Sequence, residues 1–137
     1  MDGRNTAALL YQAYLRLAEQ INTATIARNP GSRPAHATVF IHMENEGIRL
    51  TRLAEKAMMT PQAMGELVDD LERLGYLRRV PDPTDRRAKL IVFTDQGRAA
   101  LDSAFEVIAR VERDLERLLG PRKLASLQAM LELITAS

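Results

Sequence analysis

The sequence predicts a mainly helical chain that contains one small β-hairpin. Over most of the chain, apolar residues recur every three or four positions, which is the helical period. Residues 82–93, DPTDRRAKLIVF, break that period with a Pro-bounded turn, two adjacent arginines and an apolar strand. With 137 residues, 46% of them hydrophobic, the chain can form one domain core but not two independent cores. We therefore expect one fold, with the hairpin set among helices.

The first two helices are expected on either side of the segment NPGSRP, residues 29–34. The first runs from about residue 6 to 28, with apolar positions spaced four, three, four and three residues apart. These positions are Leu10, Tyr14, Leu17, Ile21 and Ala24. The second helix is expected from residue 34 or 35 to about residue 45, ending near Gly47.

A brief third helix is expected after the short extended stretch at residues 48–50. Thr51 is the predicted N-cap of the segment LTRLAEKA. Leu53, Ala54 and Ala57 are expected to face inward.

The fourth helix, residues 61–74, has well-marked ends. Thr60 supplies an N-cap oxygen, Pro61 suits the first helical position, and Gly75 suits the left-handed residue after the last turn. Its apolar positions, expected to face inward, are Met64, Leu67, Val68, Leu71 and Leu74. The more exposed positions are Gln62, Ala63, Gly65, Glu66, Asp69, Asp70 and Arg73. The exposed N-terminal turn suits an anion, although the helix could equally be one with a patch of small residues and no ligand.

Residues 76–80 and 89–93 are the expected arms of the hairpin. A long helix is expected from residues 94–95 to the Gly120-Pro121 break, and a final helix follows it. The apolar positions of the long helix are Leu101, Phe105, Ile108, Val111, Leu115 and Leu118, and those of the final helix are Leu124, Leu127, Leu131 and Ile134.

Charge is concentrated in the middle of the chain. The net charge is only +1, but residues 48–94 carry nine basic and seven acidic side chains, whereas residues 95–137 carry six and seven. Screening at physiological salt limits fields to roughly 8 Å, so the local surplus at Arg86, Arg87 and Lys89 matters more than the total. This basic hairpin suits an anionic surface; the alternative is an ordinary solvated hairpin.

Several classes of protein are disfavoured. The chain has no cysteine, which excludes disulfides, thiolate nucleophiles and Cys-ligated metals. It has no phosphate-binding Gly-rich loop and no pair of histidines at a helical metal spacing, so we expect no catalytic residues, no metal and no cofactor. It has neither an apolar run near the roughly 20 residues of a membrane span nor a secretion signal, so a cytoplasmic protein without membrane partners is expected.

Together these elements follow the order of a winged helix-turn-helix and resemble the MarR family of bacterial transcription regulators. Residues 50–101 carry the resemblance. The most specific part is DPTDRRAKL followed by FTDQG, which is similar to the family's Asp- and Arg-rich wing and its Leu-Thr-x-x-Gly junction; here Phe93 replaces the usual leucine. The resemblance implies a single domain, residues 1–137, in which helices at 1–33 and 96–137 form a dimerisation region around a DNA-binding lobe at 34–95.

The resemblance also implies where double-stranded DNA binds. Each recognition helix of a homodimer would enter a major groove, and the operator would be an imperfect palindrome with half-sites about one turn apart. Arg87 would enter the minor groove, with Arg86 and Lys89 near phosphates. The expected DNA-contacting residues are Thr60, Gln62, Ala63, Gly65, Glu66, Arg86, Arg87 and Lys89. The expected wing-orienting residues are Asp69, by pairing with Arg87, and Asp85.

Two residues of the recognition helix depart from the family pattern. Many relatives have a basic or amide residue in place of Glu66, and Thr or Ser in place of Gly65, so fewer donors face the bases here. Glu66 either accepts a hydrogen bond from a cytosine amino group or lies outside the contact set.

A small aromatic or phenolic effector is the further partner that the resemblance implies. The cleft for it would be bordered by Leu17, Phe40, His42 and Met43. Such a ligand must favour a dimer in which the recognition helices are wrongly spaced for DNA. Alternatively, Phe40 and Met43 belong to the core, and His42 is a surface or capping residue.

The expected function is a homodimeric, sequence-specific DNA-binding regulator, a repressor relieved by an effector. The alternative is a dimeric winged-helix module that binds a protein or a ligand but not DNA. Acidic residues Glu66, Asp69 and Asp70 on the recognition helix favour the alternative, whereas the intact basic wing favours the regulator.

Overall fold

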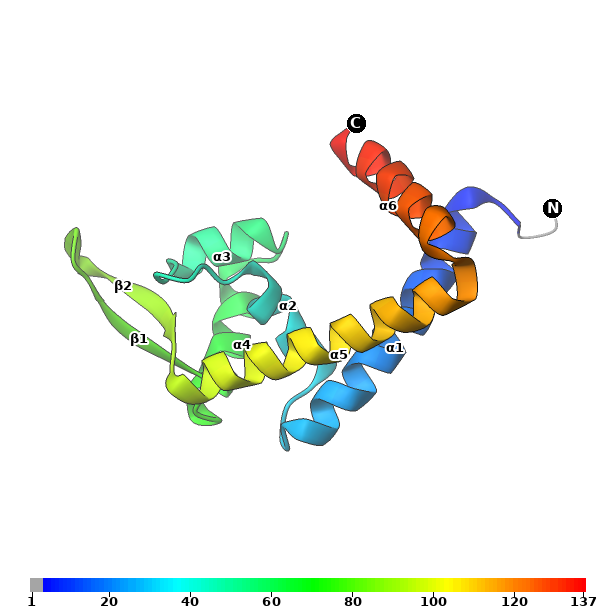
Figure 1. The fold of residues 1–137 in the computed structure, drawn as a ribbon. Coiled ribbons are helices and arrows are strands. Elements are labelled where there is room, and N and C mark those ends of the chain that lie inside the picture. The colour runs from blue at the N-terminus through cyan, green and yellow to red at the C-terminus, as the bar shows by residue number, and fades with distance from the viewer. Residues whose placement is uncertain (1–3) are drawn as a thin grey trace. The chain divides into compact units, whose positions relative to one another are not determined.

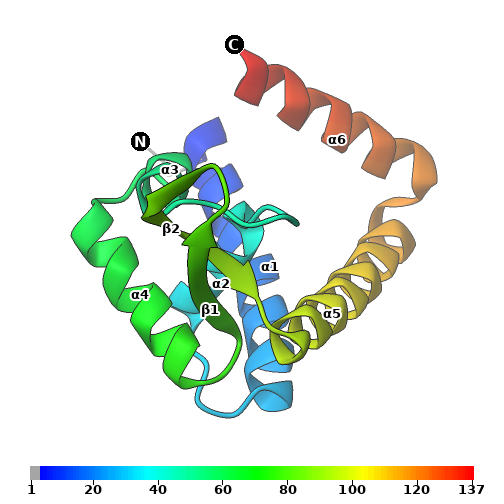
Figure 2. The ribbon, with the colours of Figure 1, turned by 90° about the vertical axis from the view of Figure 1, so that its left-hand side faces the viewer.

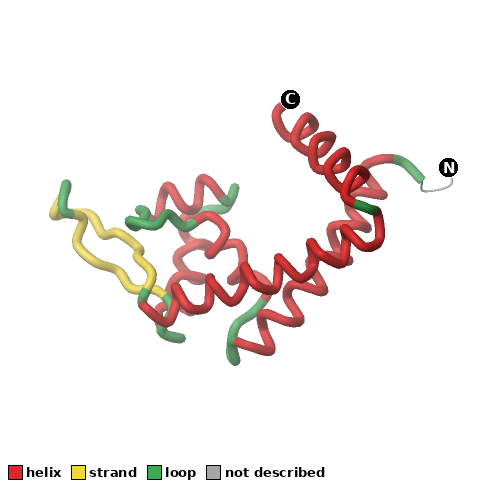
Figure 3. The backbone as a smooth tube through the Cα atoms, viewed as in Figure 1, coloured by secondary structure: helices red, strands yellow, loops and turns green. Residues whose placement is uncertain are grey.

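The computed structural model describes residues 4–137, which form six helices and one two-stranded antiparallel hairpin (Figures 1 and 3). The order of elements is the expected one, and the fold is mainly α with a β wing. The helices are α1 (Thr6–Arg28), α2 (Pro34–His42), α3 (Leu50–Lys56), α4 (Pro61–Arg73), α5 (Asp95–Leu119) and α6 (Pro121–Ala136). The strands are β1 (Leu77–Asp82) and β2 (Asp85–Phe93).

The chain divides into two compact units. We call Asn22–Ala104 the winged unit and the chain up to Ile21 together with Phe105–Ser137 the terminal unit. Both boundaries fall inside helices, α1 and α5, so each of these helices contributes to both units. Within residues 4–137, no helix has the length and apolar character needed to cross a membrane.

Helix α4 is central to the core of the winged unit, where it contacts α2, α3 and β1. Its buried side chains, Met64, Val68 and Leu71, follow the expected helical period, while Leu67 and Leu74 pack at the edge of the core. Burying a side chain of this size contributes about 1.5–3 kcal/mol. The other buried members of the core are Val39, Ile48, Leu53, Ala54, Tyr76, Leu77, Ile91 and Phe93.

Both ends of α4 form as the sequence predicts. The Thr60 Oγ1 accepts a hydrogen bond from the Ala63 backbone N–H at 3.1 Å, and Pro61 occupies the first turn. Gly75 follows the helix with φ +90°, a left-handed conformation that other residues rarely adopt. The helix ends at Arg73, one residue before the predicted end.

Two predicted boundaries are wrong. Helix α2 ends at His42 rather than near residue 45, because Met43 is already extended, with φ −63° and ψ 151°. Helix α3 begins at Leu50 with Arg49 as its N-cap residue, so Thr51 lies inside the helix and does not cap it. Ile48 fixes this start, because its backbone forms a bridge with Ile91 through bonds of 3.0 and 2.8 Å and holds the chain extended up to Arg49.

In the terminal unit, most of the large apolar side chains are exposed. Helix α1 has no fully buried residue, and the buried apolar residues of this unit's described part are Val107, Val111 and Leu124. Phe105, Ile108 and Leu118 belong to the predicted apolar stripe of α5, yet they are exposed. The other exposed apolar residues of this unit are Leu9, Tyr11, Tyr14, Leu15, Met130, Leu133 and Ile134. The helices form in the predicted order, but the predicted buried stripe of α5 is only partly correct, because Val107, which lies outside that stripe, is buried.

Candidate nucleic-acid interface

The wing is a longer and tighter hairpin than the sequence indicates. Asp82 pairs directly with Asp85, so only Pro83 and Thr84 form the turn, and the strands extend beyond the predicted arms (Figure 2). The next paired residues are Pro81 and Lys89, so residues 86–88 of β2 face no partner on β1. A bulge of this kind interrupts the ladder and redirects side chains. Arg86 and Arg87 lie in this bulge, on a strand rather than in a loop.

Asp82 holds the turn of the wing together. Its carboxylate is buried, and its Oδ1 accepts bonds of 2.8 Å from both the backbone N–H and the hydroxyl of Thr84. Its Oδ2 accepts from Arg49 Nε at 3.0 Å and Arg49 Nη2 at 2.8 Å. The bonds from Thr84, and then those from Arg49, lower the pKa of Asp82. The Asp82 carboxylate therefore connects the wing turn to the start of α3.

Asp85 acts on the other side of the turn. Its Oδ1 accepts a 3.0 Å bond from the backbone N–H of Arg87, and its Oδ2 lies 3.7 Å from Arg49 Nη2. The bond to the Arg87 backbone supports the expectation that Asp85 orients the wing.

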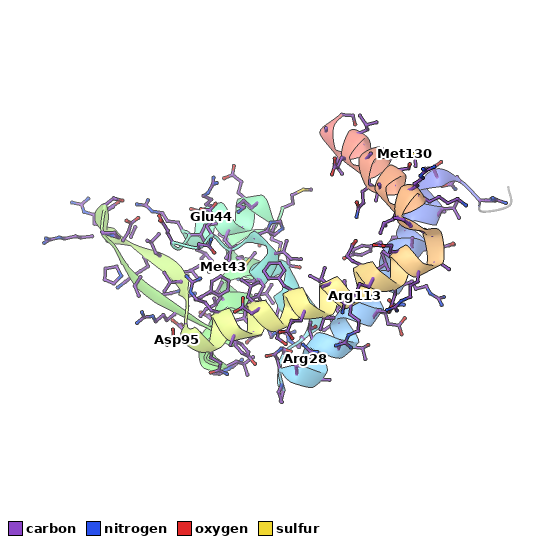
Figure 4. All side chains as sticks on the ribbon, viewed as in Figure 1. Arg28, Met43, Glu44, Asp95, Arg113 and Met130 are labelled. Atoms are coloured by element: carbon purple, nitrogen blue, oxygen red, sulfur yellow. The ribbon has the colours of Figure 1, made fainter. Side chains whose placement is uncertain are left out.

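The cations of the wing remain free to meet an anion. Arg86, Arg87 and Lys89 are all exposed, and within residues 4–137 no carboxylate pairs with any of the three. Figures 1 and 4 show the hairpin extending to one side of the winged unit, with side chains projecting around its tip. Because the Asp82 carboxylate pairs with Arg49, it does not neutralise these three cations.

The residues predicted to meet DNA from α4 differ in their exposure. Thr60, Gln62 and Glu66 are exposed, whereas Ala63 and Gly65 are half-buried. A Cβ on Gly65 would lie 3.7 Å from Leu50 Cδ2, so this position faces α3 rather than open solvent. Gln62 and Glu66 are one turn apart and share the exposed surface of the helix.

Three of the four carboxylates on α4 are ion-paired. Asp69 Oδ1 lies 2.9 Å from Arg79 Nη2, and Glu72 Oε1 lies 2.8 Å from Arg79 Nη1. The predicted pairing of Asp69 with Arg87 is therefore wrong, because Asp69 pairs with Arg79 near the start of β1. Asp70 Oδ2 lies 2.6 Å from Arg33 Nη2. In the described chain, Glu66 is the α4 carboxylate that no cation neutralises.

His36 links α2 to α4 inside the winged unit. Only 2% of the residue is exposed, and its Nδ1 accepts a 3.0 Å bond from the Arg33 backbone N–H. Its Nε2 makes no hydrogen bond and lies 3.6 Å from Asp70 Oδ2. Burial lowers the pKa of His36, although the nearby Asp70 opposes that shift.

The residues expected to border an effector cleft belong to both compact units. Phe40 stacks on Phe93, with centroids 5.8 Å apart, and Met43 (Figure 4) also packs against the core, as the alternative interpretation predicts. His42 is half-buried, and its carbonyl accepts a 2.8 Å bond from Lys56 Nζ. Leu17 is half-buried in the terminal unit. An open hollow of about 330 Å³ involves none of these four residues and is lined by Arg78, Phe93, Thr94 and Asp95.

Sequence reasoning missed the connecting roles of Arg49, Arg79 and Asp82. Arg49 and Asp82 are 33 residues apart in the chain, and only the hairpin's return to α3 brings them together. The signal available in the sequence was weak: an Asp just before a Pro-Thr turn is typical of a side chain that bonds to the turn's backbone.

Comparisons with known proteins agree with this geometry. A sequence profile described as MarR family matches residues 26–88. The transcriptional regulator HosA of Escherichia coli O111:H- is 26% identical over 106 residues, which cover 77% of this chain and 78% of HosA. PecS, an HTH-type transcriptional regulator of Dickeya dadantii (strain 3937), is 30% identical over 81 residues, 59% of this chain and 49% of PecS.

A solved structure matches nearly the whole chain. The transcriptional repressor CouR, a protein of Rhodococcus jostii RHA1, has been solved with a 23-mer DNA duplex. That structure has a TM-score of 0.79 and 28% identity, covering 96% of this chain and 92% of the CouR chain. The profile, the curated relatives and this structure together support a regulator of the MarR family.

Proposed function

We propose that this protein is a homodimeric, sequence-specific DNA-binding transcription regulator, a repressor relieved by a small-molecule effector. The observation that carries the proposal is the wing: Arg86, Arg87 and Lys89 are exposed and have no carboxylate partner in residues 4–137. They lie in the same unit as α4, whose capped first turn is exposed. The solved complex of CouR with DNA is the precedent among the relatives. A regulator of this kind performs no enzymatic reaction.

In this proposal α4 enters a major groove and the wing follows the backbone into the adjacent minor groove. The N-terminal turn of α4 contributes partial positive charge and free backbone N–H groups. Arg87 is placed in the minor groove, where the negative potential of a narrow groove favours arginine. Thr60 and Gln62 are the proposed contacts of the helix, and Glu66 discriminates between base pairs by accepting from cytosine.

The exposed apolar surface of the terminal unit supports the proposed homodimer. Apolar side chains on α1, α5 and α6 are open to solvent in the single chain, which is typical of a surface that a partner covers. We therefore assign residues 1–33 and 96–137 to dimerisation and residues 34–95 to DNA binding. Two-fold symmetry then requires a palindromic operator with half-sites about one helical turn apart.

The effector that we propose is a small aromatic or phenolic anion. CouR has also been solved with p-coumaroyl-CoA, whose coumaroyl group is phenolic. Of the four residues expected to contact the effector, His42 is retained as the proposed contact, because Phe40 and Met43 pack against the core of the winged unit. An effector can release DNA only by binding more tightly to the dimer geometry that fits the operator poorly. The proposed place of action is the cytoplasm, where bacterial DNA is found.

Fluorescence anisotropy with the protein's own upstream DNA and a scrambled duplex tests the proposal. Binding should favour the upstream DNA and weaken steeply as salt rises. Arg87→Ala should cost about 1–3 kcal/mol, roughly 5- to 150-fold in affinity, with helicity and dimer mass unchanged. Arg52→Ala is the matched control, because Arg52 is an exposed arginine that pairs with Glu44 and is not among the proposed DNA contacts.

Equal and weak binding to both duplexes would point to a distant operator or to the module that binds only proteins or ligands. Selection from random DNA sequences then separates these two, because a module without DNA affinity enriches no motif.

A further inference from the structure

The structure connects the wing to α3 by two adjacent contacts. The backbone of Ile48 forms a bridge with Ile91 of β2, through bonds of 3.0 and 2.8 Å. The next residue, Arg49, places two guanidinium nitrogens 3.0 and 2.8 Å from Asp82 Oδ2 at the far end of β1. One contact therefore holds the middle of the wing, and the other holds its turn.

The ion pair between Arg49 and Asp82 is held in a fixed geometry, unlike an exposed ion pair whose side chains can move apart. Asp82 is 5% exposed, and its other oxygen is bound by Thr84, so the carboxylate cannot turn away from Arg49 without losing the turn. Arg49 also lies 3.7 Å from Asp85, whose other oxygen binds the Arg87 backbone N–H. A chain of contacts thus runs from Arg49 through the two aspartates to Arg87.

We propose that Arg49 and Asp82 form a latch that positions the wing, so that they control DNA affinity through the placement of Arg87 and without touching DNA themselves. This inference rests on the proposed DNA-binding function. Arg49 is a positioning residue here, despite its positive charge and partial exposure. Its partner Asp82 is the more informative of the two, because the latch predicts that removing its negative charge weakens binding to an anion.

Asp82→Asn keeps the size of the side chain and removes the charge. If only overall charge mattered, this variant would bind DNA more tightly, since it raises the net charge by one. The latch predicts the opposite result, a loss of about tenfold in affinity, because charge-assisted bonds to Arg49 and Thr84 are weakened. Fluorescence anisotropy with the operator DNA at fixed salt shows directly whether the affinity rises or falls.

Arg49→Ala should weaken DNA binding by a similar factor, and the double variant with Asp82→Asn should be little worse than either single variant. In an Arg87→Ala background, Arg49→Ala should change affinity by less than about twofold, because the residue it positions is gone. Arg52→Ala is the matched control: Arg52 lies in α3, which begins directly after Arg49, and it pairs with Glu44 rather than with a residue of the wing. It removes the same charge and should leave affinity near that of the unmodified protein.

Trypsin cleavage without DNA provides a readout that a direct phosphate contact would not change. A loosened wing exposes the backbone after Arg86 and Arg87, so Arg49→Ala and Asp82→Asn should both be cleaved there about tenfold faster than the control. Mass spectrometry identifies the cut, and circular dichroism confirms that the rest of the fold is intact.

The latch is overturned if Asp82→Asn binds DNA as tightly as the unmodified protein or more tightly. It is also overturned if Arg49→Ala lowers the salt dependence of binding by about one ion with no change in trypsin cleavage, which is the behaviour of a phosphate contact. Failure of the unmodified protein to bind any selected DNA contradicts the proposed function instead, so the two failures are distinguishable.

Discussion

The two units of this chain differ in how they cover their apolar side chains. In the winged unit, eleven buried residues form one core, and Ile41 and Met58 are its exposed large apolar residues. In the terminal unit, Val107, Val111 and Leu124 are buried, while ten large apolar side chains in residues 4–21 and 105–137 are exposed. The winged unit thus has its own core, whereas the terminal unit has an apolar surface suited to a partner. In the proposed function, DNA recognition and dimer assembly fall to different parts of one small chain.

The largest expected effect comes from a charge placed on the exposed apolar surface of the terminal unit. Leu133 is 73% exposed on α6, so Leu133→Asp should barely affect a monomer. In a dimer interface the unpaired carboxylate costs several kcal/mol, and the dissociation constant should rise by about 100-fold or more. Light scattering and sedimentation velocity measure the change in mass.

Met58→Asp is the control for that experiment. Met58 is 91% exposed in the winged unit and has φ +56°, a conformation that aspartate tolerates. It should leave the mass unchanged. If Leu133→Asp and Met58→Asp have the same effect on the mass, the exposed apolar surface of the terminal unit is not a dimer interface.

Substituting one methionine in each unit compares how much a side chain of that unit contributes to the free energy of unfolding. Met64 is fully buried in the winged core, whereas Met130 is 53% exposed on α6 (Figure 4). With Leu133→Asp present in both proteins, so that association does not contribute, Met64→Ala should lower the free energy of unfolding by about 2–5 kcal/mol. Met130→Ala should change it by less than about 0.5 kcal/mol. Urea denaturation followed by circular dichroism measures both, and equal losses would contradict the difference in burial.

Two threonines of the winged unit allow a residue that caps a helix to be compared with one that was wrongly predicted to do so. Thr60 accepts the Ala63 N–H at 3.1 Å, so Thr60→Ala should cost about 1 kcal/mol of stability. Thr51 lies exposed inside α3, and Thr51→Ala should change stability by less than about 0.5 kcal/mol. Thermal denaturation of the two variants side by side is sufficient, and a larger loss for Thr51→Ala would mean that α3 is capped differently.

The smallest expected effect is a pH dependence from His36 in the winged unit. The pKa of His36 is lowered by burial, despite Asp70 beside it, while Arg33 also disfavours the charged ring. The unfolded chain therefore binds this proton more readily than the native one. The contribution of His36 to stability is complete above about pH 6.5 and is lost as the pH falls from there toward the lower native pKa.

Urea denaturation between about pH 7.5 and 5 measures this slope. The pKa of Asp70 is lowered, mainly by Arg33, so that carboxylate stays charged throughout this range. His36→Asn should flatten the slope, because asparagine can still accept the Arg33 N–H but does not titrate. An unchanged slope in His36→Asn would exclude His36 as its source.

Local sequence determined the elements and the basic wing. Thr60, Pro61 and Gly75 mark the ends of α4 through cap and turn chemistry that acts within a few residues, and the structure places those ends within one residue. The period of the apolar residues likewise predicted which side chains of α4 are buried. Such features are predictable because their causes are neighbours in the chain.

Tertiary structure alone decided how the charges are paired and where α3 begins. Asp69 could have met Arg79 or Arg87, and only the position of β1 beside α4 selected Arg79. Arg49 reaches Asp82 because the hairpin returns to the bridge between Ile48 and Ile91, which also fixes the first residue of α3. Ion pairs and bridges of this kind join residues far apart in sequence, so their partners depend on how the elements pack and not on any local pattern.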